Sequence, residues 1–300
     1  MTKAERFEGC ILGGAIGDAY GSGHENKVTE KETTFYLFGK PEKKEPAWQI
    51  TDDTQLTLAT IEAIIEDEKV KPQTLANRFL EYYKSRRLRG IGASTLKSLE
   101  ELSAGGHWRQ VGRKGEYAAG NGAAMRVAPL AFKEELTNSQ IRNLCLITHH
   151  NDEAYVGALC IVVAIRETLR GNWNGETNLI ELIVEKIPDT RVRDRLIEIK
   201  GLNSLKDIGQ KGKDGYVVNS VPLAIAAANK VSQIGIEEMY SEMIEIGGDT
   251  DTNCSIAGQI AGTLLGKQQI PSKLISKLQQ LREFEWIQTT INDLVRKENW

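Results

Sequence analysis

The chain has 300 residues, of which 40% are apolar, and this content is enough to bury a large core. Its 38 basic and 41 acidic residues give a net charge of −3, which offers no general attraction to nucleic acid or membranes. The longest apolar run, 158–165, is too short to span a bilayer, and residues 1–8 do not resemble a signal peptide. Four cysteines without a C-x-x-C pair indicate buried, reduced thiols, so we expect a cytoplasmic protein.

Hydrophobic residues recur mainly at the period of an α-helix. Helices are predicted wherever this period holds: 54–65, 75–83, the later part of 144–169, 221–231, 237–246 and 256–265. Pro222 is expected to open the helix 221–231, because proline suits a first turn. Residues 33–38 are the best strand candidate and could equally be loop, and 171–214 should form surface helices and loops. With no composition break, we predict an all-α fold, a single compact orthogonal helical domain over 1–300.

Two series of glycines recur every four residues. They are Gly9, Gly13, Gly17 and Gly21 near the start, and Gly258, Gly262 and Gly266 near the end. Glycine inside a helix costs about 1 kcal/mol relative to alanine, so these positions need a packing reason. Residues four apart share a helix face, and a glycine face admits another backbone. We predict two buried, closely packed helices, with each other as one choice of partner; Gly21 could instead lie in a loop.

Two segments rich in Asp and Thr precede predicted helices. The first, Thr51-Asp52-Asp53-Thr54, could by itself be an ordinary helix cap. The second, 247–252, repeats the pattern after two glycines, and two such helix starts suggest a shared cation. The candidate ligands are all oxygens, which favours a hard ion such as Mg²⁺, Mn²⁺ or Ca²⁺ over zinc. We rank Mg²⁺ and Mn²⁺ first, because no calcium-loop spacing is present.

Several motifs, taken in order, resemble the ADP-ribosylglycohydrolase family, which includes the dinitrogenase reductase-activating glycohydrolase and the ADP-ribosyl-arginine and ADP-ribosyl-serine hydrolases. They are the glycine-rich opening 9–21, the segment 51–54, the run 120–126, Thr148-His149, and the segment 247–252 followed by Ala257-Gly258. The resemblance implies a helical fold with a metal site at helix N-terminal loops. It also implies a hydrolase that uses two Mg²⁺ or Mn²⁺ ions to release ADP-ribose from a modified side chain or a small ADP-ribose conjugate.

The resemblance also implies roles for particular residues. The metal ligands would be Thr51, Asp52, Asp53, Asp249, Asp251 and Thr252. Glu25 falls where the ADP-ribosyl-serine branch has a catalytic glutamate, and either Glu25 or Asp53 would relay protons. The substrate would contact Gly120, Asn121, Gly122 and His149, and Tyr117 is the nearby candidate for stacking on adenine, with Tyr216 as an alternative. From the residues themselves, Asp18 is expected to support the metal loops, and Gly90, Gly92 and Thr95 to be scaffold. Arg126 could bind a phosphate or pair with an acid in the core, and we favour the structural role.

Other interpretations remain open at this point. The segment 120–122 could be a plain turn, and the protein could be an inactive ADP-ribose binder or a crystallin-like structural member of the family. Such relatives often lose metal carboxylates, whereas Asp52, Asp53, Asp249 and Asp251 are all present. A phosphoesterase and a nucleotide-binding Rossmann enzyme fit less well, because no strand precedes the glycines near Gly13. The acceptor residue is undetermined, specificity is expected in 25–50, and a monomer is plausible.

Overall fold

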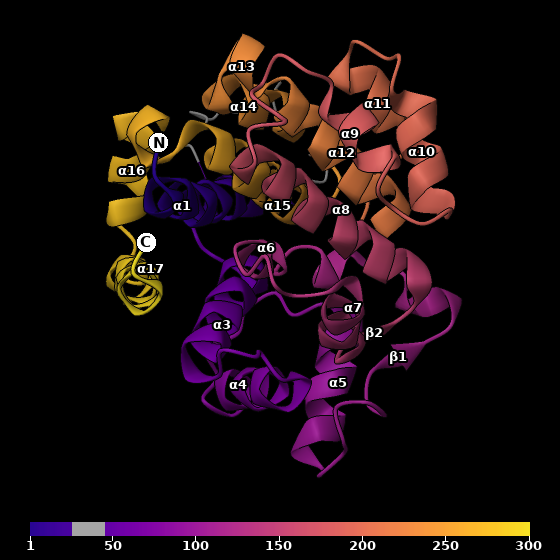
Figure 1. Ribbon diagram of the computed structural model, residues 1–300, viewed down its shortest axis with the longest axis vertical. Helices are drawn as coiled ribbons and strands as arrows, with labels where there is room; N and C mark the ends of the chain where they lie inside the picture. The colour runs from indigo at the N-terminus through magenta and orange to yellow at the C-terminus, as the bar shows by residue number, and fades with distance from the viewer. Residues whose placement is uncertain (26–45) are drawn as a thin grey trace, which may run out of the picture.

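The computed structural model describes residues 1–25 and 46–300, and this part of the chain is predominantly helical (Figure 1). The longer helices are α1 (Lys3–Ser22), α3 (Asp52–Glu66), α4 (Pro72–Lys84), α5 (Ala93–Ser103), α8 (Asp152–Leu169), α12 (Val217–Asn229), α14 (Ile236–Ile246), α15 (Thr250–Leu265) and α17 (Phe284–Glu298). The shorter ones are α6 (Ala128–Ala131), α7 (Asn138–Leu146), α9 (Leu179–Val184), α10 (Arg191–Ile199), α11 (Leu205–Lys211), α13 (Val231–Ile234) and α16 (Ser272–Gln279). The described residues also form the 3₁₀ turns η2 (Glu116–Ala118), η3 (Asn121–Ala123) and η4 (Lys267–Gln269). Within the described residues, β1 (Arg113–Lys114) and β2 (His149–His150) form one short parallel pair. The fold is all-α, as predicted.

The centre of the molecule is the pair α1 and α15, which lie side by side (Figure 1). Their backbones approach so closely that a methyl group added at Gly13 would collide with the carbonyl of Gly258, and one at Gly258 with the carbonyl of Gly13. A methyl group at Gly17 would meet the carbonyl of Cys254 in the same way. The predicted packing of the two glycine series on each other is therefore confirmed.

The ends of this contact are fixed by polar groups. Gly21 belongs to α1 rather than to a loop, and its carbonyl accepts a 2.9 Å hydrogen bond from the Thr250 hydroxyl. From α14, the buried Tyr240 hydroxyl donates a 2.7 Å bond to the Gly13 carbonyl. Gly266 lies just beyond α15 with φ of +66°, a conformation that favours glycine at a helix end. The contact thus brings the end of α1 to the start of α15.

The helix that contains Pro222 begins earlier than predicted from the sequence. Pro222 lies inside α12, which begins at Val217, so the prediction that Pro222 opens this helix is wrong. The start is set by tertiary contacts, because the Val217 amide donates a 2.9 Å bond to the Ala119 carbonyl. The helices expected around 54–65, 75–83, the later part of 144–169, 237–246 and 256–265 are confirmed, with α15 beginning earlier, at Thr250. Residues 144–146, expected to be loop, are the end of α7. The strand candidate 33–38 lies outside the described residues.

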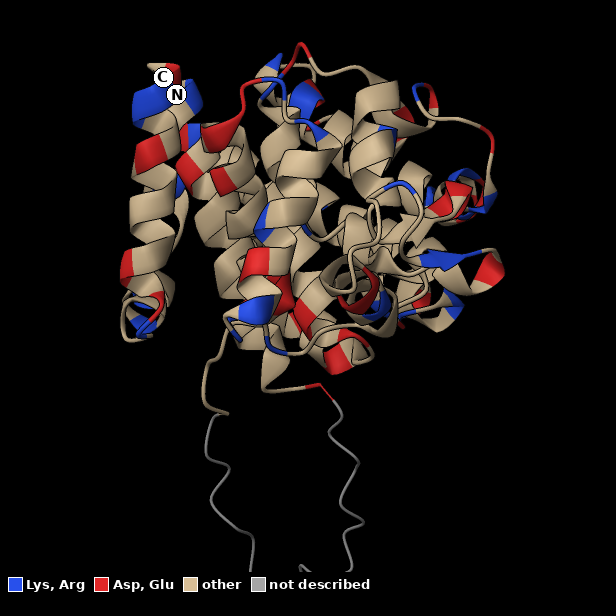
Figure 2. Cartoon of the chain, turned by 90° about the horizontal axis from the view of Figure 1, so that it is seen from below, with Lys and Arg blue, Asp and Glu red and all other residues tan. Residues whose placement is uncertain are grey.

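The buried apolar side chains form one cluster that draws on helices from α1 to α17. The two termini lie together (Figures 1 and 2), where Trp300 packs edge-on to Phe7 and the Lys3 ammonium lies 4.5 Å from the Trp300 ring centre. Acidic and basic residues are interspersed around the periphery (Figure 2). All four cysteines are buried and unpaired. Among the described helices, none has the length and apolar character needed to cross a membrane.

Candidate functional site

The N-terminus of α3 is held by an aspartate from α1. Thr51 is the N-cap, and its amide and hydroxyl donate bonds of 2.9 and 2.8 Å to the buried carboxylate of Asp18. The Thr54 amide donates to the same carboxylate at 3.1 Å. Asp18 therefore fixes the first turn of α3, which places Asp52 and Asp53 at the positive end of the helix dipole. The supporting role expected for Asp18 agrees with these contacts.

The N-terminus of α15 is shaped by two glycines. Gly247 and Gly248 have φ of +76° and +91°, which places them in the left-handed region that favours glycine. The turn brings the Asp249 amide to the Lys213 carbonyl at 3.0 Å. The Thr252 hydroxyl then donates a 3.0 Å bond to Oδ2 of Asp53, across 199 positions of sequence. The two Asp/Thr segments therefore meet, as the shared-cation hypothesis requires.

Carboxylates gather where these two helix starts meet. Oxygen atoms of Asp18, Asp53 and Asp251 lie within 4.8 Å of one another, and so do those of Glu25, Asp249 and Asp251. Asp18 completes the first set, but both of its oxygens already accept hydrogen bonds from Thr51 and Thr54, so we assign Asp18 a supporting role. Of the carboxylates predicted as metal ligands, Asp52 belongs to neither set, although it lines the same cavity.

The electrostatics of the cluster suit a divalent cation. Burial and then repulsion from Asp251 raise the pKa of Asp53 well above its usual value and that of Asp249 to about 7. Burial is also the main cause that raises the pKa of Asp251 to about 6. Oδ1 of Asp53 is buried and has no hydrogen-bond partner among the described residues. Buried carboxylates in this state are costly unless a cation neutralises them, and oxygen ligands suit a hard ion.

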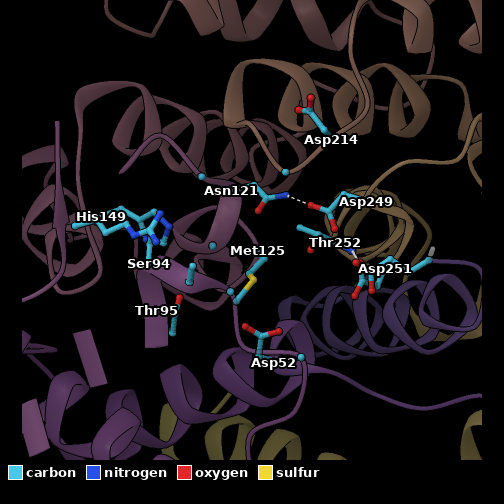
Figure 3. A pocket seen from close by; sticks show the side chains of 18 of the residues that line it. Asp52, Ser94, Thr95, Asn121, Met125, His149, Asp214, Asp249, Asp251 and Thr252 are labelled. Carbon is cyan, nitrogen blue, oxygen red and sulfur yellow. Dashed lines mark hydrogen bonds between the residues drawn. The ribbon is translucent and has the colours of Figure 1, made fainter. Parts of the chain in front are cut away.

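A cavity of 570 Å³ opens beside the cluster, within the size range of ligand pockets. Figure 3 shows its two sides: Asp249 and Asp251 face it from one side, and His149 lies at the opposite side. Asn121 lies between them and points toward Asp249 (Figure 3), to which its side-chain amide donates a 2.7 Å hydrogen bond. The cavity is therefore acidic at one end and carries a histidine at the other.

The segment 120–122 and His149 form a single wall. The backbone amide of Asn121 donates a 3.1 Å hydrogen bond to the Gly215 carbonyl, and this bond holds the turn in place. Gly120 and Gly122 lie against the imidazole so closely that a methyl group on either would lie 3.3 Å from Nε2. His149 is buried, and burial, followed by the positive charge of Arg126, lowers the pKa of His149 to about 3. The imidazole is therefore neutral at physiological pH.

The chain is similar to known proteins along its whole length. The model of the ADP-ribosylglycohydrolase family matches residues 1–300. The chain belongs to the ADP-ribosylglycohydrolase family. It is 29% identical to ADP-ribosylhydrolase ARH3 of Xenopus tropicalis over 89% of each chain. It is 26% identical to ADP-ribosylarginine hydrolase Tri1 of Pseudomonas putida over 91% of this chain and 74% of that protein. A solved ADP-ribosylglycohydrolase-related protein complex aligns with a TM-score of 0.65 and 25% identity, covering 98% of each chain.

In this member of the family, most of the site residues expected from sequence line one cavity. The lining residues among them are Glu25, Asp52, Tyr117, Gly120, Asn121, Gly122, His149, Asp249, Asp251 and Thr252. Thr51 and Asp53 lie behind the cavity wall and are buried. Tyr117 is 87% exposed at the rim, and Tyr216 is not part of the lining. The structure thus brings the residues together, while their individual roles remain predictions.

Several cavity residues were not predicted from sequence. Gly90, Gly92 and Thr95, expected to be scaffold, line the cavity, as do Arg113 and Asp214. Asp214 precedes Gly215, and an Asp-Gly pair is typical of a turn. This pattern indicates loop geometry but says nothing about function. Arg113 had no signal, because it lies in a two-residue strand that no alternation could reveal.

Proposed function

We propose that the protein is a metal-dependent hydrolase that cleaves the glycosidic bond between ADP-ribose and a modified side chain of arginine or serine type, releasing ADP-ribose. One observation carries the proposal. The Thr252–Asp53 and Asn121–Asp249 hydrogen bonds join both acidic helix starts and the glycine turn around one cavity. Relatives named as an ADP-ribosylhydrolase and an ADP-ribosylarginine hydrolase support the reaction class.

The cofactor in this proposal is a pair of Mg²⁺ or Mn²⁺ ions. Ligands would come from two helix starts: Thr51, Asp52, Asp53, Asp249, Asp251 and Thr252. The partnerless Oδ1 of Asp53 and the mutual repulsion of the buried carboxylates support this assignment. When bound, the ions would supply Lewis acidity that orients the ribose hydroxyls and lowers the pKa of a water molecule.

Other residues would bind the ADP-ribose at one end of the cavity and stabilise the reacting ribose at the other. The backbone amides of Gly120 and Gly122 would receive the diphosphate, because that of Asn121 already donates to the Gly215 carbonyl. Tyr117 at the rim would stack on the adenine. Positive charge develops on the ribose as the glycosidic bond breaks, and the carboxylates at the acidic end would stabilise it.

Proton transfer is assigned to Glu25 or Asp53. Burial and the charge of Asp249 raise the pKa of Glu25, and its side chain reaches the cavity, so Glu25 is suited to exchange a proton with water or the leaving group. Asp53 is buried behind the wall, where its Oδ2 accepts from Thr252. We therefore favour Glu25 as the proton relay and Asp53 as a ligand.

We further infer that residues 1–300 form one domain, because a single apolar cluster spans the described helices. The partners would be ADP-ribosylated proteins or small ADP-ribose conjugates. A cytoplasmic setting suits the four buried, unpaired cysteines.

The test is release of ADP-ribose from arginine-linked and serine-linked conjugates with Mg²⁺, Mn²⁺ or EDTA. Wild-type protein should release ADP-ribose only with a divalent ion, and Asp251→Asn should abolish release. Asp207→Asn is the matched control, because Asp207 is an exposed acid on α11 outside the cavity. Full activity of the Asp251 variant would overturn the site, and no release from any conjugate would favour an inactive ADP-ribose-binding or crystallin-like protein.

A further inference from the structure

A buried arginine links the two parts of the wall opposite the carboxylates. The Arg126 side chain is 3% exposed, and its guanidinium lies 4.9 Å from the ring centre of Phe79. One guanidinium nitrogen donates to the carbonyl of Gly122. The other terminal nitrogen donates a 2.9 Å hydrogen bond to the hydroxyl of Thr148. Arg126 therefore contacts the glycine turn and the residue that precedes His149.

The hydrogen-bond chain continues from Thr148 to the imidazole. The Thr148 hydroxyl oxygen lies 2.7 Å from Nδ1 of His149. Arginine can only donate, so this oxygen is the acceptor toward Arg126 and retains its own hydrogen. The described residues offer that hydrogen no other acceptor, so it points to Nδ1. Nδ1 is then the unprotonated nitrogen of the neutral ring, and Nε2 carries the hydrogen.

The Nε2–H group faces the cavity without a partner. His149 is 2% exposed and lines the cavity, and among the described residues Nε2 has no hydrogen-bond partner. The ring lies against Gly120 and Gly122, on the side of the cavity opposite Asp249 and Asp251 (Figure 3). A donor that faces a cavity and has no protein partner is available to an acceptor that a ligand supplies.

We propose that Arg126 and Thr148 are positioning residues that hold His149 as its Nε2–H tautomer, so that Nε2–H donates to a diphosphate oxygen of ADP-ribose bound at the turn Gly120-Asn121-Gly122. The identity of the ligand rests on the proposed function, whereas the tautomer is a property of the free protein. Because burial keeps the ring neutral, this donor works without a change of charge at neutral pH.

The tautomer can be read directly by long-range ¹H–¹⁵N spectra of ¹⁵N-labelled protein. The chain has four histidines, and the His149 signals are those that disappear in His149→Gln. We expect a pyridine-type Nδ1 and a pyrrole-type Nε2 in the wild type and in Thr148→Ser, which keeps the hydroxyl. Thr148→Val removes the hydroxyl at similar volume and should mix or reverse the tautomers. A protonated Nδ1 in the wild type would overturn the proposal, whether or not the valine variant folds.

Affinity for ADP-ribose supplies the second readout. Calorimetry should show binding about tenfold weaker in Thr148→Val than in the wild type, with Thr148→Ser restoring most of it. In turnover, the valine variant should lose more in KM than in kcat, because the diphosphate is remote from the bond that breaks. Unchanged tautomer and affinity in the folded valine variant would contradict the proposal.

The tautomer and the ligand of His149 are tested by separate results. A wild-type protein with the expected tautomer that binds no ADP-ribose would overturn the ligand and, with it, the proposed function. A wild-type protein that releases ADP-ribose but carries the hydrogen on Nδ1 would overturn the positioning role alone.

Discussion

The side-chain nitrogen of Asn121 lies 2.7 Å from Oδ2 of Asp249, and this hydrogen bond joins the glycine turn to the acidic start of α15 across 128 positions of sequence. The backbone reinforces the link. The Asn121 amide donates to the Gly215 carbonyl at 3.1 Å, and the Asp249 amide donates to the Lys213 carbonyl at 3.0 Å. The segment 213–215 therefore braces both loops, and the orientation of a predicted metal ligand depends on the predicted substrate loop.

Replacing Asn121 should impair metal-dependent activity. A hydrogen bond to a charged group contributes about 1.5–3 kcal/mol, so Asn121→Ala should lower kcat/KM by about 10–100-fold. Asn121→Asp should be worse, because it places a like charge beside Asp249. Steady-state kinetics and Mn²⁺ titration check this, with exposed Asn77→Ala on α4 as the control. Wild-type metal affinity and turnover in Asn121→Ala would show that the bond does not orient Asp249.

The acidic cluster should make the metal-free protein less stable as pH rises. Unfolded aspartate titrates near pH 4, whereas in the fold burial raises the pKa of Asp251 to about 6 and that of Asp249 to about 7. Between about pH 4 and 7 the folded state binds more protons than the unfolded state. These groups therefore contribute most to the free energy of unfolding at about pH 4, and this contribution is lost as pH rises through their folded pKa values.

A divalent cation should offset this loss. We expect the increase in Tm on replacing EDTA by Mn²⁺ to be larger at pH 8 than at pH 5, because protons compete with the cation at low pH. Comparing the two Tm values at each pH cancels remote groups, including His149, whose lowered pKa acts with the opposite sign. Asp251→Asn should reduce the increase. An increase that does not vary with pH would exclude these carboxylates as ligands.

Patterns of local spacing indicated two features: close helix packing in the core, and a common location for the two Asp/Thr segments. A four-residue glycine period predicted that both helices pack closely, with each other as one choice of partner, and the structure shows that α1 and α15 meet where a Cβ would not fit. The pair Asp53 and Thr252 was predicted to share one site, because each lies among more oxygen groups than a helix cap needs. Their 3.0 Å hydrogen bond agrees with that reasoning.

Features set by tertiary contacts were not predictable from the sequence. The start of α12 depends on the bond from Val217 to Ala119, and no local signal outweighed Pro222. The chain from Arg126 through Thr148 to His149 likewise joins separate elements. The sequence favoured a structural role for Arg126 but could not indicate which cavity wall Arg126 contacts.

Glu25 should affect turnover more than ligand affinity. Its carboxylate lies with those of Asp249 and Asp251, and Glu25→Gln removes the exchangeable proton at nearly constant shape. Loss of a general acid or base lowers kcat by about 10²–10⁴-fold, and the pH limb that belongs to Glu25 should vanish from the kcat profile. Rapid-quench kinetics and ADP-ribose calorimetry separate the two effects. Unchanged kcat would transfer the role to Asp53, for which Asp53→Asn is the next variant.

The packing of α1 on α15 predicts that alanine, a better helix former than glycine, destabilises the protein at Gly13. The added methyl group would collide with the Gly258 carbonyl, and such overpacking costs about 1–3 kcal/mol, more than the gain of about 1 kcal/mol in helix propensity. Urea unfolding should show the loss, whereas Gly201→Ala, with open space around the new Cβ, should be close to neutral.

Gly258→Ala tests the same contact from the other helix, where the methyl group would meet the Gly13 carbonyl and the Tyr240 hydroxyl. If one close approach accounts for both losses, the double variant should lose less than the sum of the single variants, because the first methyl group already separates the helices. Strictly additive losses of stability would instead mean that each glycine is required by a separate local contact. The four-residue glycine period would then not describe a shared helix interface.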